Sequence, residues 1–177
     1  MWLNLDLQGI LVNLQIHNYQ KVPKDDCGTW CKVDFSFVTK PWLSYGNEND
    51  EILLCSEVDE IITILEKLVA DQLQEPTEFG CVEPDFSFRF YPKKDLRNDP
   101  KYTYVAPGHE IVDVSMEWEV TLWNDGYTAN RLVLTLKRQK IEQLLSYLQL
   151  IAGRVSPYDP AIHQLMEKRT IYEDITS

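Results

Sequence analysis

The chain has 177 residues, enough for one domain with a substantial core, and its 44% hydrophobic and 11% aromatic content is typical of a folded protein rather than a disordered one. With 28 acidic and 17 basic residues its net charge is −11, which argues against direct nucleic-acid binding, because affinity for phosphate comes from Lys and Arg. The same charge favours a partner with a basic surface, or serves solubility alone.

The N-terminus and the cysteines indicate a cytoplasmic protein. The first residues lack the basic start and apolar run of a signal peptide, and no stretch approaches the roughly 18 apolar residues of a membrane span. We therefore expect a protein without membrane contact, whose cysteines are thiols. The four cysteines are Cys27, Cys31, Cys55 and Cys81. They lack the paired Cys-x-x-Cys spacing of a structural zinc site, although a metal or redox pair at Cys27 and Cys31 stays open as an alternative.

Two segments near the N-terminus have the alternation of strands. Residues 1–19 predict a strand or hairpin, and residues 30–38 predict a half-buried strand after a polar loop. One face of the second strand carries Cys31, Val33, Phe35 and Phe37. The other face carries Trp30, Lys32, Asp34 and Ser36. We expect the first face to be buried and the second to point outward.

A loop and a helix are predicted next. Gly46, Asn47 and Asn49 indicate a loop ahead of the helix. Ser56 predicts the start of the helix, because its hydroxyl can cap the free amides of the first turn. The apolar stripe of this helix is Val58, Ile61, Ile62, Leu65, Leu68 and Val69.

The second half of the chain predicts further strands and helices. The strands are 85–91, 111–123 and 131–137, and Phe86 and Trp118 belong to the apolar faces of the first two, which we expect to point inward. A long polar loop covers 92–109, and Asn124-Asp125-Gly126 is a turn signal that makes the last two strands an antiparallel hairpin. A helix is expected from about 139 to 152, and a short helix within 157–170.

These elements predict an α+β fold with a single antiparallel β-sheet and two amphipathic helices packed on one face. Each strand has one apolar face, and the two helices can cover that face. Residues 1–153 are expected to form this single domain. Residues 154–177 are expected to be a C-terminal extension containing the short helix, and the sequence assigns it no role.

No catalytic constellation is visible in the sequence. His17, His109 and His163 lie in unrelated contexts, and none has the spacing of a metal-binding helix. A nucleophile elbow and a Gly-rich phosphate loop are missing as well. Asp50 and Glu51 belong to an acidic cluster without the spacing of a calcium loop. We therefore predict a non-catalytic protein without metal or cofactor.

The predicted binding site is the sheet face opposite the helices. Acidic groups mixed with large aromatic side chains make a docking surface, because aromatics supply binding energy and carboxylates supply steering. The predicted partner-binding residues are Trp30, Asp34, Asp85, Asp113, Glu117, Glu119 and Trp123. The alternative is an ordinary solvated face whose aromatics are covered by loops such as 92–109.

Four segments, in this order and spacing, resemble the immunity proteins of wall-associated polymorphic toxins (WapI type). They are the helix start Ser56-Glu57-Val58-Asp59-Glu60-Ile61, the strand Val82-Glu83-Pro84-Asp85-Phe86-Ser87-Phe88, the strand Ser115-Met116-Glu117-Trp118-Glu119-Val120, and the closing strand and helix over 132–150. The resemblance spans roughly residues 30–152 and implies a bacterial cytoplasmic protein. Such a protein binds and neutralises the C-terminal toxic domain, often a nuclease, of a cognate secreted toxin.

Two other functions stay open at this point. One is a structural or scaffolding role, as a homodimer formed through an edge strand. The other is an enzyme with an unrecognised, metal-assisted site that uses Asp50, Glu51 or the cysteines. The sequence predicts neither the oligomeric state nor the identity of the partner.

Overall fold

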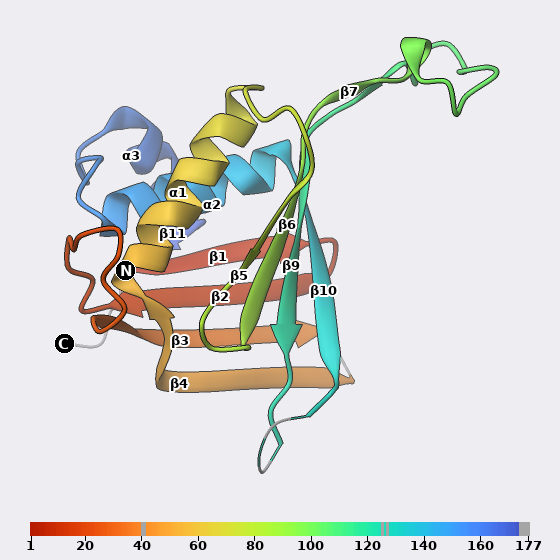
Figure 1. Ribbon diagram of the computed structural model, residues 1–177. Coiled ribbons are helices and arrows are strands. Elements are labelled where there is room, and N and C mark those ends of the chain that lie inside the picture. The colour runs from red at the N-terminus through yellow and green to blue at the C-terminus, as the bar shows by residue number, and fades with distance from the viewer. Residues whose placement is uncertain (40–41, 125, 127, 174–177) are drawn as a thin grey trace.

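In the described part of the chain, most strands form two antiparallel sheets that run across one another, with helices packed at one end (Figure 1). The short strands Lys94–Asp95 and Ile111–Val112 form a separate antiparallel pair. The computed structural model describes residues 1–39, 42–124, 126 and 128–173. The fold is therefore α+β, as predicted, but the prediction of a single sheet with two helices is wrong. Alternation shows that each strand has one buried face, but it does not show which strands pair. Strands with one apolar face can form two sheets packed against each other as well as one sheet covered by helices.

The first sheet has the strand order β11-β1-β2-β3-β4. Its members are β1 (Trp2–Leu7), β2 (Ile10–His17), β3 (Trp30–Thr39), β4 (Leu43–Leu54) and β11 (Ile171–Tyr172). The second sheet has the order β10-β9-β6-β5. Its members are β5 (Thr77–Gly80), β6 (Phe86–Tyr91), β9 (Ser115–Thr121) and β10 (Arg131–Lys137). The predicted hairpin of β9 and β10 is confirmed, although Asp125 of its turn and residues 174–177 of the tail lie outside the described residues.

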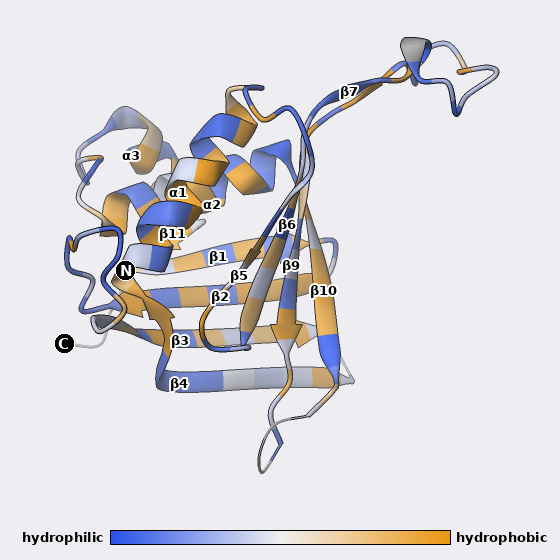
Figure 2. Cartoon of the chain, in the orientation of Figure 1, coloured by the Kyte–Doolittle hydropathy of each residue, from blue (hydrophilic) through white to orange (hydrophobic). Residues whose placement is uncertain are grey.

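Three α-helices in the described ranges complete the body. They are α1 (Cys55–Val69), α2 (Arg138–Ile151) and α3 (Pro160–Glu167). Apolar segments of α1, α2 and both sheets face a shared interior (Figure 2). Residues after 153 contribute to the same core, because Ile162 of α3 and Ile171 of β11 are both fully buried within it.

The two sheets meet at a cluster of aromatic rings. Phe35 of β3 lies 5.1 Å from Phe86 and 5.2 Å from Trp118, measured between ring centroids, and both partners belong to the second sheet. Edge-to-face and tilted ring pairs at such distances add to the free energy of burial. Phe86 and Trp118 were predicted to point inward, and the structure confirms this: each is at most 2% exposed. Their contact with the first sheet could not be foreseen from periodicity.

The predicted loop ahead of α1 is wrong in part, because β4 occupies Leu43–Leu54. Gly46 and Asn49 are turn formers, but an edge strand tolerates polar residues and bulges. The register of β4 against β3 shifts twice, and Asn49 adopts a positive φ of 56° at one shift. Its backbone amide donates to Asp34 Oδ1 at 2.6 Å, which holds the bulge in place.

The start of α1 also differs from the prediction. The helix begins at Cys55, and the hydroxyl of Ser56 donates to the carbonyl of Asp26 at 2.7 Å instead of capping the helix. Glu57 takes over the capping role, since its Oε2 accepts from the backbone N–H of Leu54 at 2.8 Å. A carboxylate in the first turn also interacts favourably with the helix dipole.

The predicted polar loop 92–109 belongs to an arm that projects from the body (Figure 1). The arm contains β7 (Lys94–Asp95), the 3-10 turn η1 (Leu96–Asn98) and β8 (Ile111–Val112). Because it projects from the body, it does not extend over the strand faces that it would cover in the alternative interpretation. Several of its apolar side chains are exposed, Tyr102 to 50% and Tyr104 to 76%.

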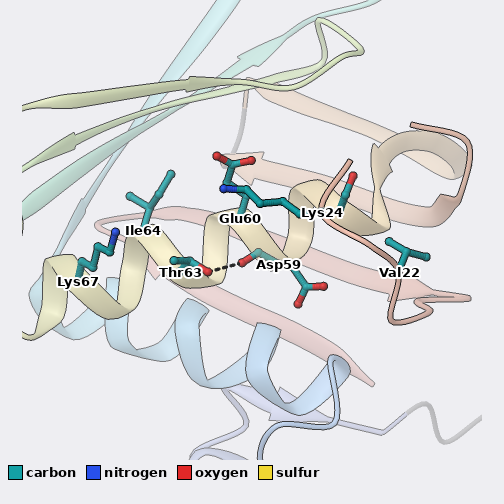
Figure 3. A pocket seen from close by; sticks show the side chains of 8 residues that line it. Val22, Lys24, Asp59, Glu60, Thr63, Ile64 and Lys67 are labelled. Carbon is teal, nitrogen blue, oxygen red and sulfur yellow. Dashed lines mark hydrogen bonds between the residues drawn. The ribbon is translucent and has the colours of Figure 1, made fainter. Parts of the chain in front are cut away.

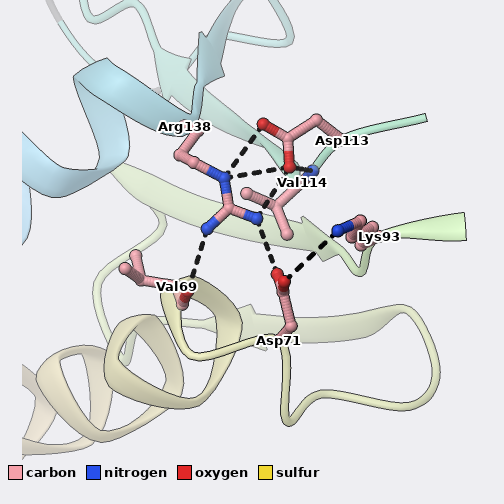
Figure 4. Close-up of polar contacts among 6 residues, drawn as sticks. All are labelled: Val69, Asp71, Lys93, Asp113, Val114 and Arg138. Carbon is pink, nitrogen blue, oxygen red and sulfur yellow. Dashed lines mark hydrogen bonds and ion pairs between the residues drawn. The ribbon is translucent and has the colours of Figure 1, made fainter. Parts of the chain in front are cut away.

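One arginine fastens the base of the arm to both long helices (Figure 4). Arg138 opens α2, and its guanidinium donates to Asp113 at the base of the arm, to Asp71 after α1 and to the carbonyl of Val69. Lys93, just before β7, pairs with Asp71 at 3.6 Å. A planar guanidinium suits such a junction, because its donors point in several fixed directions.

We expect Arg138→Gln to lower the melting temperature by about 2–4 °C at pH 7. The Arg138 hydrogen bonds lower the pKa of Asp71 and of Asp113. Stability from these bonds is therefore present above the ordinary Asp pKa and is lost as the pH falls through the lowered values. Thermal unfolding of both chains from pH 7 to pH 2 would test this. A difference that grows toward low pH would contradict it.

Candidate partner-binding surface

The seven predicted binding residues do not share one face. Trp30 and Asp34 lie on the outer face of β3 in the first sheet, whereas Glu117 and Glu119 lie on the outer face of β9 in the second. The alternation within β3 is correct, since Cys31, Val33, Phe35 and Phe37 are buried. The assignment to a single face depended on the single sheet and is wrong for the same reason.

Several of the predicted carboxylates already have partners within the chain. Glu117 accepts a hydrogen bond from the Tyr91 hydroxyl at 2.9 Å, and Arg131 donates to Glu119 at 2.7 Å. Asp34 binds His17 Nε2 at 2.8 Å. As described above, Asp113 is held by Arg138. Charges offset in this way attract a distant partner less than unpaired charges do.

Asp85 and Trp123 come together, although they are distant in sequence. Trp123 Nε1 donates to Asp85 Oδ1 at 2.7 Å. The sequence placed Asp85 on the exposed face of a strand, but it lies just before β6 and is only 6% exposed. That expectation is wrong because the strand begins one residue later than predicted, which leaves Asp85 at the turn.

A hollow of about 280 Å³ surrounds this pair, and we call it the acidic hollow. It is lined by Asn47, Asp50, Glu51, Ile52, Glu83, Asp85 and Trp123, which come from β4, the β5–β6 turn and the segment after β9. Lys32 pairs with Glu51 at 2.9 Å. Asp50, Glu83 and Asp85 form no ion pair with any residue that the structure describes. The hollow is thus a concentration of negative charge that the described residues offset only at Glu51.

The carboxylates of this region repel one another. Burial raises the pKa of the Asp85 carboxyl, and the charges of Glu83 and Asp50 raise it further. Burial likewise raises the pKa of Glu57, with Glu60 and Glu83 adding to the effect. A cationic group from a partner would relieve this repulsion, because an opposite charge favours the ionised form.

Asp85→Asn is expected to have opposite effects on stability and on binding. At pH 7 the variant should be more stable, because an amide oxygen can still accept from Trp123 while the buried charge is gone. The contribution of Asp85 to the stability of the natural chain is fully present below the ordinary Asp pKa and is lost as the pH rises through the raised value, and the variant should lack this loss. Affinity for a basic partner should drop roughly tenfold, or about 1.4 kcal/mol. Denaturant titrations at pH 4 and pH 7, with binding at pH 7, would measure both effects, and a loss of stability at pH 7 would contradict the assignment.

A second hollow, of about 410 Å³, lies between α1 and the loop before β3 (Figure 3). Its lining includes Asp59 and Glu60, but also Lys24 and Lys67. Asp59 is already held by Arg154 Nη2 at 2.5 Å and by the Tyr19 hydroxyl at 2.9 Å. Mixed charge and internal partners make this hollow a poorer match for a basic surface than the acidic hollow.

The four cysteines are free thiols, as predicted, and the alternative of a pair formed by Cys27 and Cys31 is contradicted. Cys31 lies against Cys55, with 3.3 Å between the sulfur atoms, whereas Cys27 is exposed at the surface. Burial raises the pKa of the Cys31 thiol, and the neighbouring Cys55 raises it further. In the part of the chain that the structure describes, no three His, Cys, Asp or Glu side chains gather as metal ligands would.

Sequence reasoning missed Glu83 and weighed Asp50 only as a metal ligand. The available signal was the density of acids in 48–51 and 83–85, in segments that lack Lys and Arg. What brings the two segments together is the crossing of the sheets. Tyr45 of β4 reaches the end of β9, where its hydroxyl accepts from the backbone N–H of Trp123 at 3.3 Å.

Comparison with known proteins identifies the family. The family model for WapI-like immunity proteins matches residues 3–155. The chain belongs to the WapI-like immunity protein family. The match includes both sheets apart from β11, both long helices and all residues of the acidic hollow. The resemblance seen over residues 30–152 is thereby confirmed and extended to the N-terminal hairpin.

The other comparisons add little. The comparison with curated proteins found no match. Among solved structures, the plant transcriptional regulator PBF-2 is similar at 9% identity and a TM-score of 0.39, over 96% of this chain and 87% of that chain. A likeness this distant carries no argument about fold or function. None of the helices in the described ranges is long and apolar enough to span a bilayer.

Proposed function

We propose that this WapI-like protein is a non-catalytic immunity protein. It binds the C-terminal toxic domain of a cognate secreted bacterial toxin in the cytoplasm and blocks it by occupation. Membership of the immunity family over residues 3–155 carries the proposal. The acidic hollow supports it by supplying a surface on which a basic domain can dock.

The charge of the chain suits a nuclease as the toxin. A nuclease needs Lys and Arg to hold phosphate, and a protein that covers those groups must present negative charge to them. Asp50, Glu83 and Asp85 lie beside the indole of Trp123, and their carboxylates form no ion pair with a Lys or Arg of the described chain. Attraction between unlike surfaces speeds association and discriminates against acidic partners.

A binding titration tests the proposal. The full chain is titrated by calorimetry with the C-terminal domain of a large secreted toxin encoded beside its gene, at 50 mM and 500 mM salt as approximate working concentrations. We expect one-to-one binding that weakens at high salt, and loss of toxic activity in the complex. Absence of binding at both concentrations would exclude this pairing. Binding that leaves the toxin fully active would exclude neutralisation by occupation.

A further inference from the structure

β4 is an edge strand whose outer side has no strand partner in the part of the chain that the structure describes. It is the last strand in the order of the first sheet, and among the described residues it pairs only with β3. It lies outermost of the strands of that sheet in Figure 1. An edge of this kind presents backbone N–H and C=O groups to another chain. Because β4 is twelve residues long, it is also a long edge.

The regular part of this edge is Leu43–Asn47. Over that stretch β4 pairs residue by residue with 35–39 of β3. The register shifts begin after Asn47, where a bulge interrupts the edge. Bulges limit how far a further strand can pair. An added strand would therefore find a regular ladder over Leu43–Asn47 and would reach the bulge and its carboxylates next.

The negative charge beside the β4 edge determines which kind of strand can pair with it. Residues 42–51 contain Glu48, Asp50 and Glu51 and no Lys or Arg. Glu83 and Asp85 face the same region across the acidic hollow. A second copy of the chain would bring its own carboxylates and a net charge of −11 to this edge, which disfavours self-pairing. A basic segment meets complementary charge at the same place.

We infer that an extended, basic segment of the toxin domain adds to the first sheet along β4. Its backbone pairs with Leu43–Asn47, and its Lys or Arg side chains reach Asp50 and Glu83 in the acidic hollow. Backbone hydrogen bonds supply affinity in such strand addition, and side chains supply specificity. The inference rests on the proposed function and names the form in which the partner binds.

Amide hydrogen exchange, resolved by NMR on the labelled full chain, tests this mode. The probe is the toxin domain whose binding has first been established by titration. In an edge strand, alternate amides point outward. We expect the outward amides of Leu43–Asn47 to exchange roughly tenfold or more slowly in the complex, while the inward amides, already paired with β3, change little. The amides of Tyr102 and Tyr104, in the arm, serve as internal controls.

Each outcome decides a different point. Binding together with alternating protection supports strand addition. Binding without protection over Leu43–Asn47, or with protection confined to the arm, overturns the strand addition and leaves the proposed function standing. Protection of these amides in the free chain that increases with protein concentration would assign the edge to a second copy. Absence of binding in the titration removes the proposed function, and the strand addition with it.

Discussion

The double variant Asp50→Lys/Glu83→Lys is expected to bind the toxin domain about 10²- to 10³-fold more weakly than the natural chain, or by about 3–4 kcal/mol. Both carboxylates line the acidic hollow, and neither has an ion-pair partner in the described part of the chain. Reversal therefore removes two attractions and places two repulsions against a basic partner. The Asp50 side chain is exposed and that of Glu83 is half-buried at the turn before β6, so the folded chain should tolerate the change. Calorimetric titration and denaturant unfolding measure the two quantities separately.

A matched control separates local contact from overall charge. Glu75→Lys/Glu142→Lys changes the net charge by the same amount, from −11 to −7, because each reversal adds two units. Both residues are exposed and lie away from the residues that line the acidic hollow. We expect this control to lose at most a fewfold in affinity through weaker long-range attraction. Equal losses in the two double variants would show that net charge, and not the acidic hollow, governs binding.

Trp118→Ala is expected to lower the free energy of unfolding by about 3–5 kcal/mol. The indole is 1% exposed and packs against rings from both sheets, with its centroid 5.2 Å from Phe35 and 5.1 Å from Phe86. Its removal leaves a cavity where the two sheets cross, and the rigid strands cannot close it. Denaturant unfolding at pH 7, followed by circular dichroism, measures the loss.

Two companion variants make this result interpretable. Trp118→Phe should cost less than half as much, because a ring still fills the site and the buried indole N–H, which has no acceptor among the described residues, is removed. Trp42→Ala should change stability by no more than about 0.5 kcal/mol, because that indole is 75% exposed. A small loss for Trp118→Ala, similar to that for Trp42→Ala, would contradict the packing between the sheets.

The acidic hollow depends on the packing of the two sheets against each other. The same crossing of sheets that buries Trp118 also brings the β5–β6 turn toward β4. A destabilised interface between the sheets should therefore weaken toxin binding even without a change of charge. Binding and stability are expected to fall together in core variants, and to separate in variants of the acidic hollow.

The sequence by itself determined the inward face of β3, most of the buried stripe of α1, and the net negative charge of the chain. Phe35, Phe86 and Trp118 were assigned inward from alternation alone, because side chains on a strand point to opposite faces in turn. The family resemblance was also visible from short segments and their order. Turn formers in 43–51 concealed β4, since a bulged edge strand needs no regular alternation.

Only the tertiary structure decided how these faces combine. Periodicity is a local property, whereas the pairing of β3 with β4, and the crossing of the sheets at Phe35 and Trp118, depend on contacts between distant segments. The same holds for the carboxylates. The alternation places both Glu117 and Asp85 on the outward faces of their strands. In the fold, Glu117 lies on an outer face and accepts a hydrogen bond from Tyr91, whereas Asp85 is buried beside Trp123. Whether a charge is offset or left available to a partner depends on what the fold places within a few ångströms of it.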